Sequence, residues 1–277
     1  MSIKLYPWQD ALEKALLDLR DRLPNGLLVY GPRGAGIFDL VQAFAKSLLC
    51  TQPAADGTPC GRCHGCHLVR AGTHPDIRYV VSEAESLPRE IPFVPPDTAA
   101  SDRKTVYREI LIHQTRALTD FLNLKSHEGG VRIVLVYPAD RIRAEAAASL
   151  LKSLEEPPEN TVFMLVADEI DRVLPTIRSR CRLIRAGAPT REQALEWLKS
   201  QGVQDAERKL TEAGGMPLAG AGIWQAPKWV VSHSTSLNLQ KKLRLSHRRP
   251  IRRDSILGSI RFGTSDVFPS IRSMPRQ

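Results

Sequence analysis

Hydrophobic residues occur along this chain in two alternating patterns. Short apolar runs, typical of strands buried in a sheet, predict strands at residues 26–30, 131–136 and 161–167, and a further strand is predicted at 74–81. Between the runs at 131–136 and 161–167, apolar residues recur at helical spacing, namely Ala147, Leu150, Leu151 and Leu154. Pro157 and Pro158 end the helix predicted at 144–156. Strands that alternate with helices in this way predict an α/β fold with a parallel sheet covered by helices.

Other segments of the first 220 residues show weaker patterns. Apolar spacing predicts further helices at residues 5–19, from 37 onward, 110–124, 191–199 and 206–212. Thr190 is a suitable N-cap for the helix at 191–199. The stretch 82–103 contains four prolines and few periodic apolar residues, so we expect an exposed loop there.

A glycine-rich turn joins the first predicted strand to the helix after it. Gly31, Gly34 and Gly36 stand where a phosphate-binding loop would lie, at a helix N-terminus. Such a loop ends in Gly-Lys-Ser/Thr, because the lysine holds the β and γ phosphates and the hydroxyl ligates Mg²⁺. Here Ile37 and Phe38 follow. The segment is either an ATP site or a plain strand-to-helix turn; we favour the turn and do not expect ATP to bind this chain.

Four of the five cysteines form a group with nine, two and two residues between successive members, namely Cys50, Cys60, Cys63 and Cys66. The intervening Gly57, Gly61 and Gly65 permit tight turns. This spacing predicts structural Zn²⁺ rather than redox use or a disulfide framework, with a stabilisation on the order of 10 kcal/mol. Four thiolates leave no open position for catalysis. We therefore expect the nearby histidines to be surface residues, and these are His64, His67 and His74.

Two longer motifs give a specific resemblance. The run Leu-Leu-Lys-Ser-Leu-Glu-Glu-Pro-Pro at 150–158, followed after one strand by Ser179, Arg180 and Cys181, resembles the AAA+ subunits of the sliding-clamp loader of bacterial DNA polymerase III. The resemblance extends over about residues 7–217. It implies an AAA+ core at 1–188 with the zinc module inserted at about 50–66, and a partial helical lid at 189–220.

Departures from this family pattern indicate which type of clamp-loader subunit the chain resembles. Active relatives end a strand with Asp-Glu-Ala-Asp, where this chain has Tyr-Pro-Ala-Asp at 137–140, and they place an arginine where Leu218 stands. Together with Ile37 and Phe38, three phosphate or metal contacts are missing. A chain that keeps the zinc module and the Ser-Arg-Cys motif but lacks these contacts resembles the delta-prime subunits, which implies no intrinsic ATPase activity.

Arg180 is the residue to which the resemblance gives a function. In the family, the Ser-Arg-Cys arginine reaches across a subunit boundary to the γ-phosphate of ATP bound by the neighbour. The resemblance therefore implies that Arg180 is an arginine finger acting in trans, and Ser179 is expected to help to position the turn. Cys181 is expected to be a packing thiol. A solvated or ion-paired arginine without such a role is the alternative.

Composition changes this picture mainly at the C-terminal end. The net charge of +9 arises entirely from residues 221–277, since residues 1–220 carry 28 basic and 28 acidic side chains. This tail is Ser- and Arg-rich, lacks helical periodicity and does not match the collar domain of the family. We expect it to be disordered and the product of a reading-frame shift, although a basic tail that binds DNA phosphates is an alternative.

The implied setting is the clamp-loader complex in the cytoplasm. No apolar run approaches the length of a membrane span, and the N-terminus lacks a signal-peptide pattern. The resemblance implies gamma or tau, delta, the sliding clamp and primed DNA as partners, as part of the polymerase holoenzyme. Two other functions remain open, an active AAA+ ATPase of the gamma type and a zinc-containing DNA-binding protein, and the neutral charge of residues 1–220 disfavours the second.

Overall fold

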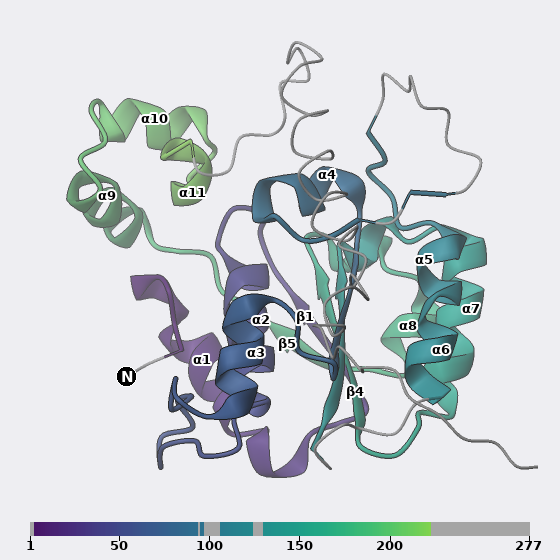
Figure 1. Ribbon diagram of the computed structural model, residues 1–277. Helices are drawn as coiled ribbons and strands as arrows, with labels where there is room; N and C mark the ends of the chain where they lie inside the picture. Colours follow the sequence, from purple (N-terminus) through teal and green to yellow (C-terminus); the bar gives the residue numbers. More distant parts are fainter. Residues whose placement is uncertain (1–2, 94, 97–105, 124–129, 223–277) are drawn as a thin grey trace, which may run out of the picture. The chain divides into compact units, whose positions relative to one another are not determined.

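Five parallel strands in the order β2-β3-β4-β1-β5 form the centre of the computed structural model, which describes residues 3–93, 95–96, 106–123 and 130–222 (Figure 1). The strands are β1 (Gly26–Tyr30), β2 (Ile77–Val81), β3 (Arg132–Tyr137), β4 (Thr161–Ala167) and β5 (Arg182–Arg185). Leu28 of β1 is in register with Leu165 of β4 on one side and Leu183 of β5 on the other. All four pairings are parallel, as the alternation of strands and helices predicted.

The burial of the strands explains their composition. Every residue of β3 and β4 is buried, because both strands are internal and both faces of the sheet are covered. β5 lies at one edge, and three of its four residues are exposed. The sequence Arg-Leu-Ile-Arg therefore carries little hydrophobic signal, and sequence analysis missed this strand.

Helices cover both faces of the sheet. One group consists of α1 (Asp10–Leu17), α2 (Ile37–Leu48) and α3 (His64–Ala71), and the other of α5 (Ile112–Arg116), α6 (Leu118–Asn123), α7 (Ala144–Glu155) and α8 (Pro175–Arg178) (Figure 1). Each face has its own hydrophobic cluster. Phe44 of α2 is central to the first, and Leu150 of α7 and Ile177 of α8 belong to the second.

Short elements connect the larger ones. The short α-helix is α4 (Glu83–Ser86), and the 3₁₀ helices are η1 (Pro7–Gln9), η2 (Arg20–Arg22), η3 (Leu87–Arg89), η4 (Ala139–Arg141) and η5 (Ile170–Arg172). The expectation of an exposed loop over 82–103 is wrong at its start, because Ser82 and all of α4 are buried. Residues 97–103 of that loop lie outside the described part. The helix predicted at 110–124 is two helices, which meet at Ala117.

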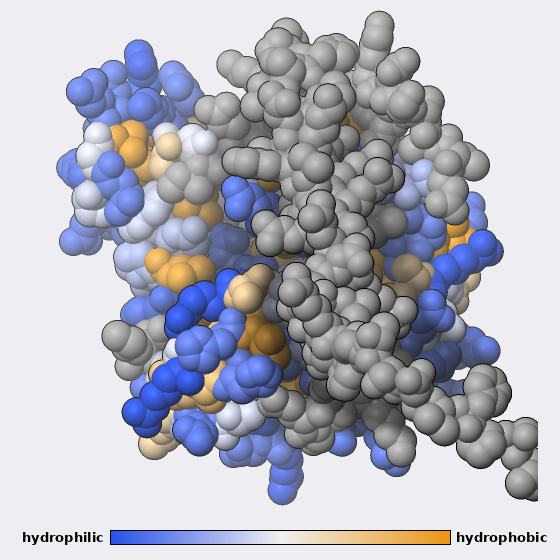
Figure 2. All heavy atoms as spheres, viewed as in Figure 1, coloured by the Kyte–Doolittle hydropathy of each residue, from blue (hydrophilic) through white to orange (hydrophobic). Residues whose placement is uncertain are grey.

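Three helices after residue 189 form a small lid with its own core. They are α9 (Arg191–Ser200), α10 (Ala206–Glu212) and α11 (Pro217–Gly220), and they pack around Ala194, Leu198, Ala206 and Leu210. Thr190 caps α9 as expected, since its hydroxyl accepts a hydrogen bond from the Gln193 N–H at 3.2 Å. The visible outer surface of these helices is largely hydrophilic (Figure 2).

The expectations for the basic tail fall almost wholly on residues 223–277, which are outside the described residues. Within the described ranges, no helix has the length and apolar character needed to cross a membrane.

Candidate functional site

The glycine-rich turn lies between β1 and α2, where sequence analysis placed it, and contacts from the N-terminal segment hold it. The Trp8 Nε1–H donates to the Ala35 carbonyl at 2.8 Å, and the Gln9 amide donates to the Gly36 carbonyl at 2.7 Å. Gly36 has a positive φ of 72°, and a Cβ there would lie only 2.3 Å from the Tyr6 ring. Only glycine fits this position, because the ring packs directly on the backbone.

An aromatic group joins this turn to the lid. Tyr6 and Trp8 are stacked with ring centroids 5.2 Å apart, and Trp197 of α9 packs edge-on against both at 5.6 Å. Burial and the neighbouring Asp39 carboxylate raise the pKa of Tyr6 to about 12, so its hydroxyl stays neutral at physiological pH. The lid is therefore packed onto the N-terminal segment that holds the turn.

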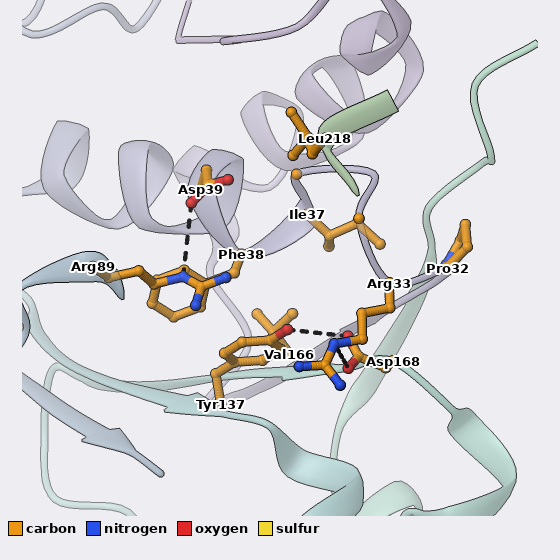
Figure 3. A pocket seen from close by; sticks show the side chains of 12 residues that line it. Pro32, Arg33, Ile37, Phe38, Asp39, Arg89, Tyr137, Val166, Asp168 and Leu218 are labelled. Atoms are coloured by element: carbon orange, nitrogen blue, oxygen red, sulfur yellow. Dashed lines mark hydrogen bonds and ion pairs between the residues drawn. The ribbon is translucent and has the colours of Figure 1, made fainter. Parts of the chain in front are cut away.

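The two residues that replace the lysine and hydroxyl of an active phosphate loop belong to the core. Ile37 is 6% exposed and Phe38 is 3% exposed. The Phe38 ring packs against Tyr137 with centroids 4.9 Å apart, and the Arg89 guanidinium lies over Phe38 at 5.0 Å (Figure 3). Leu218 of α11 is also buried and lines the same small cavity. Apolar side chains thus pack where a complete phosphate-binding loop would have its lysine and hydroxyl.

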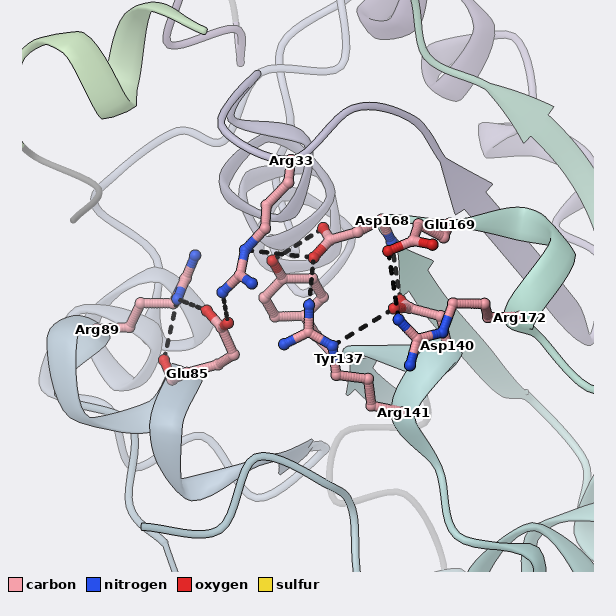
Figure 4. A network of polar contacts seen from close by, with 9 residues as sticks. All are labelled: Arg33, Glu85, Arg89, Tyr137, Asp140, Arg141, Asp168, Glu169 and Arg172. Carbon is pink, nitrogen blue, oxygen red and sulfur yellow. Dashed lines mark hydrogen bonds and ion pairs between the residues drawn. The ribbon is translucent and has the colours of Figure 1, made fainter. Parts of the chain in front are cut away.

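An ionic network closes the rest of this position (Figure 4). Arg33 of the turn forms a short ion pair with Glu85 of α4, and its Nε lies 3.4 Å from Asp168 Oδ2. Arg141 Nη2 reaches the same Asp168 oxygen at 3.5 Å, while Arg89 Nη1 pairs with Glu85 at 2.8 Å. These contacts tie the turn to α4 and to the ends of β3 and β4.

The side chains around the turn are paired by charge and leave little space. The network holds three guanidinium groups and four carboxylates, namely Arg33, Arg89 and Arg141 with Asp39, Glu85, Asp140 and Asp168. Burial and the adjacent Asp140 raise the pKa of Asp168 to about 6, although Arg33 and Arg141 oppose this. The cavity beside the turn measures about 20 Å³, which is room for about one water, whereas ligand pockets in proteins have ~300 Å³ or more.

The four clustered cysteines are brought together. The four sulfurs of Cys50, Cys60, Cys63 and Cys66 all lie within 4.8 Å of one another. A tetrahedral zinc with bonds of about 2.3 Å requires sulfurs about 3.8 Å apart, and the Cys50 and Cys63 sulfurs are 3.9 Å apart. The arrangement is compatible with a structural zinc site.

The backbone around the cysteines supports this arrangement. The Cys60 N–H donates to the Cys50 sulfur at 3.2 Å and the Cys63 N–H donates to the Cys60 sulfur at 3.3 Å, contacts that favour thiolates. Burial and a hydrogen bond with the Cys63 sulfur raise the pKa of the Cys66 thiol to about 12, and the nearby Cys50 sulfur adds a smaller electrostatic contribution. A divalent cation would stabilise the ionised form of such buried sulfurs, so the donor set fits Zn²⁺.

The nearby histidines differ in their surroundings. His64 and His67 are exposed, as expected, but His74 is only 5% exposed. The prediction that His74 is a surface residue is therefore wrong. Its Nδ1 accepts a hydrogen bond from the Asp76 N–H at 3.1 Å, so this imidazole caps the turn that precedes β2.

Arg180 lies on the turn between α8 and β5. Its side chain is 35% exposed, and Nη1 donates to the Thr176 carbonyl at 2.8 Å and to Ser179 Oγ at 3.2 Å. Ser179 Oγ also donates to the Thr176 carbonyl at 3.1 Å. The Ser179 hydroxyl therefore links the guanidinium of Arg180 to the last turn of α8.

The turn is seated on the start of β1. A Cβ at Gly26 would lie 2.9 Å from the Arg180 carbonyl oxygen and 3.0 Å from the Cys181 sulfur, so a larger residue would displace the turn. Cys181 packs against the second hydrophobic cluster, and burial raises the pKa of its thiol to about 11. It is a packing thiol and not an activated nucleophile.

Sequence analysis missed the network around Arg33. Arg33, Glu85 and Asp168 come from three separate elements, and no local pattern connects them. The one local signal was Arg33 itself, a charged residue inside a glycine-rich turn. Its presence does not identify the carboxylates with which it pairs.

The parallel sheet, the turn at the start of α2 and the helical lid together define an AAA+ type of domain, in which side chains of the chain itself pack beside the turn. A family model described as "DNA polymerase III, delta subunit" matches residues 10–189, and the chain belongs to this family.

Relatives with curated names agree with this assignment. The chain is 37% identical over 218 residues to DNA polymerase III subunit delta' of Pseudomonas aeruginosa and 31% identical over 232 residues to that of Escherichia coli. These matches cover 77% and 82% of this chain, but it spans only 60% and 63% of the two relatives. The resemblance to delta-prime subunits is confirmed.

Solved structures show weaker similarity. A DNA polymerase III gamma subunit-related protein of Thermotoga maritima matches with a TM-score of 0.44 and 18% identity, over 72% of this chain and 56% of that one. The RuvB Holliday junction branch migration motor of the same organism matches with a TM-score of 0.42 and 14% identity, over 77% and 59%. The family assignment rests on the sequence match.

Proposed function

We propose that this chain is a non-catalytic subunit of the DNA polymerase III clamp loader and supplies Arg180 in trans to ATP bound by a neighbouring ATPase subunit. The observation that carries the proposal is a contrast within one chain. Arg33, Ile37 and Phe38 close its own phosphate position, while Arg180 stays exposed on a turn with fixed geometry. The chain therefore has an accessible guanidinium at Arg180, whereas the guanidinium groups of Arg33 and Arg89 beside its own turn are paired with carboxylates.

The proposed contact of Arg180 with the neighbour's phosphate suits a guanidinium group. An arginine offers parallel N–H donors to phosphate oxygens and keeps its charge at any physiological pH. Arginine fingers in nucleotide hydrolases raise the rate by roughly 10³- to 10⁵-fold, because they stabilise the charge that develops as the phosphoryl group is transferred. Ser179 supports this role by restraining the turn.

The partners follow from the subunit type. We infer that the chain assembles with gamma or tau and with delta, and that the complex loads the sliding clamp on primed DNA in the cytoplasm. In this arrangement residues 1–188 form the AAA+ core, 189–220 a partial lid and 221–277 a basic tail that does not replace the family's collar domain. The zinc module serves as scaffold, since four thiolates leave zinc no open coordination position.

Reconstitution with the other loader subunits tests the Arg180 role. Arg180→Ala should lower DNA-stimulated ATP turnover of the complex by at least about 100-fold, and Arg180→Lys should not restore it, because lysine lacks the planar fork. Arg191→Ala is the matched control, since Arg191 is an exposed, ion-paired arginine of the lid. Equal turnover for the wild type and Arg180→Ala would overturn the proposal.

Equilibrium dialysis of the isolated chain with labelled ATP tests the closed pocket. We expect no saturable binding at micromolar ATP, because the network and the apolar side chains leave about 20 Å³ beside the turn. Micromolar affinity would instead favour an active ATPase.

A further inference from the structure

Three groups of the same chain restrain Arg180. Besides the contacts of Nη1 with the Thr176 carbonyl and Ser179 Oγ, Nη2 lies 2.5 Å from Glu155 Oε1. Glu155 is the last residue of α7, and its side chain is 49% exposed. The guanidinium is thus accessible to another molecule, yet both of its terminal nitrogens already have partners that set its orientation.

Buried neighbours anchor both ends of this ion pair. Leu154, next to Glu155, is 6% exposed, and Ile177, three residues before Arg180, is fully buried in the same hydrophobic cluster. The pair therefore links the end of α7 to the turn after α8 through two fixed backbones. Such a contact orients a side chain more firmly than one between two mobile segments.

Helix stability does not explain a glutamate at residue 155. The C-terminal end of a helix favours cations, because its free carbonyls carry partial negative charge, yet Glu155 and Glu156 both stand there. An exposed ion pair also adds little to the stability of a fold. The ion pair with Arg180 explains a glutamate at residue 155 better than helix stability does.

We propose that Glu155 is a positioning residue for the arginine finger. Its carboxylate fixes Nη2, so that the guanidinium meets the neighbour's phosphate without searching among rotamers. This inference rests on the trans role of Arg180 proposed above. Glu155 itself does not touch the nucleotide; it acts only through Arg180.

A double-mutant cycle in the reconstituted loader tests this inference. Glu155→Ala should lower kcat by roughly 2- to 12-fold, which is the ~0.5 to 1.5 kcal/mol for immobilising one long side chain, converted at about 1.4 kcal/mol per factor of ten. The KM for ATP should stay within about twofold, because Glu155 does not contact the ground-state nucleotide. In the Arg180→Ala background, Glu155→Ala should have no further effect.

Two further variants separate positioning from a general effect on the helix end. Glu156→Ala removes the adjacent exposed carboxylate, which has no ion pair among the contacts described for this chain, and should leave turnover unchanged. Glu155→Gln keeps an acceptor for Nη2 and should retain more activity than Glu155→Ala. All three variants should unfold within about 2 °C of the wild type, since the pair is exposed.

The outcomes distinguish the two proposals. If Arg180→Ala turns over as fast as the wild type, both the trans role and the role of Glu155 are overturned. If Arg180→Ala is slow but Glu155→Ala matches or exceeds the wild type, or if the two losses multiply in the double variant, only the role of Glu155 is overturned.

Discussion

Single side chains fill the space beside the glycine-rich turn. Where an active loop has a lysine, Ile37 is buried in the core, and Arg33 points its charge at Glu85 and Asp168 of the same chain. The arginine is neutralised internally, so it adds no net positive potential at the turn. The substitutions do more than remove phosphate contacts, because they fill the space with packed and paired groups.

Asp168 makes the stability of this network depend on pH. Burial and Asp140 raise its pKa from 3.8 to about 6 in the folded chain, so ionisation is less favourable there than in the unfolded chain. The stabilising contribution is present below about pH 4 and is lost as the pH rises through about 6. The shift corresponds to about 3 kcal/mol.

Urea unfolding of wild type and Asp168→Asn at a series of pH values measures this effect. Asparagine does not titrate, so the free energy of unfolding of the variant relative to the wild type should increase by about 2 to 3 kcal/mol between about pH 4 and about pH 7.5. If the difference in free energy of unfolding does not change with pH, ionisation of Asp168 does not destabilise the folded chain.

Packing contacts between elements hold the lid and the zinc module. The lid has few buried residues of its own, and Trp197 adds contacts to Tyr6 and Trp8 of the N-terminal segment. The module begins where α2 ends and continues into α3, and a Cβ at Gly65 would meet the Leu49 carbonyl at 2.3 Å. Helix α3 therefore packs tightly on the chain that supplies Cys50.

Trp197→Ala should loosen the lid without affecting the sheet. Loss of the aromatic contacts should lower the local opening free energy of α9–α11 by roughly 1 to 3 kcal/mol. Hydrogen exchange measured on peptides from 190–222 should speed up, while peptides from β3 and β4 stay unchanged. Glu196→Ala, at an exposed position of the same helix, is the control. Unchanged exchange in the lid would contradict the assigned role of the aromatic group.

The cysteine group should bind one zinc ion per chain. Cys63→Ser should abolish this stoichiometry and destabilise the module, since structural zinc binding contributes on the order of 10 kcal/mol in small modules. Cys181→Ser is the matched control, because Cys181 lies outside the group and packs on the other face of the sheet. Metal analysis of the purified chains measures the stoichiometry; full zinc content in Cys63→Ser would contradict a four-thiolate site.

At the scale of the whole molecule, sequence patterns predicted the elements with a strong hydrophobic signal. The strands β3 and β4 and helix α7 were predicted within one or two residues, because both strands are fully buried and one face of α7 is buried at helical spacing. Patterns failed where tertiary contacts decide. The edge strand β5 is mostly exposed, α4 is buried although its sequence is Glu-Ala-Glu-Ser, and the side chain of His74 is used inside the fold.

The residues of the candidate site divide in the same way, into those with a local sequence signal and those that depend on tertiary contacts. Cys50, Cys60, Cys63 and Cys66 were found from spacing, because zinc ligands are close in sequence, whereas Arg180 was singled out only by resemblance. Neither Glu155 as its partner nor the network around Asp168 could be predicted. Both depend on side chains that meet from separate elements.

Binding of a transition-state analogue to the reconstituted loader tests the central claim most directly. ADP with aluminium fluoride imitates the transferring phosphoryl group, so a group that acts on the transition state contributes more to binding this complex than to binding ATP. Arg180→Ala should weaken binding of the analogue by about 100-fold or more and weaken binding of a non-hydrolysable ATP analogue by less than about threefold. Equal losses for both ligands, or no loss for either, would contradict a finger provided in trans.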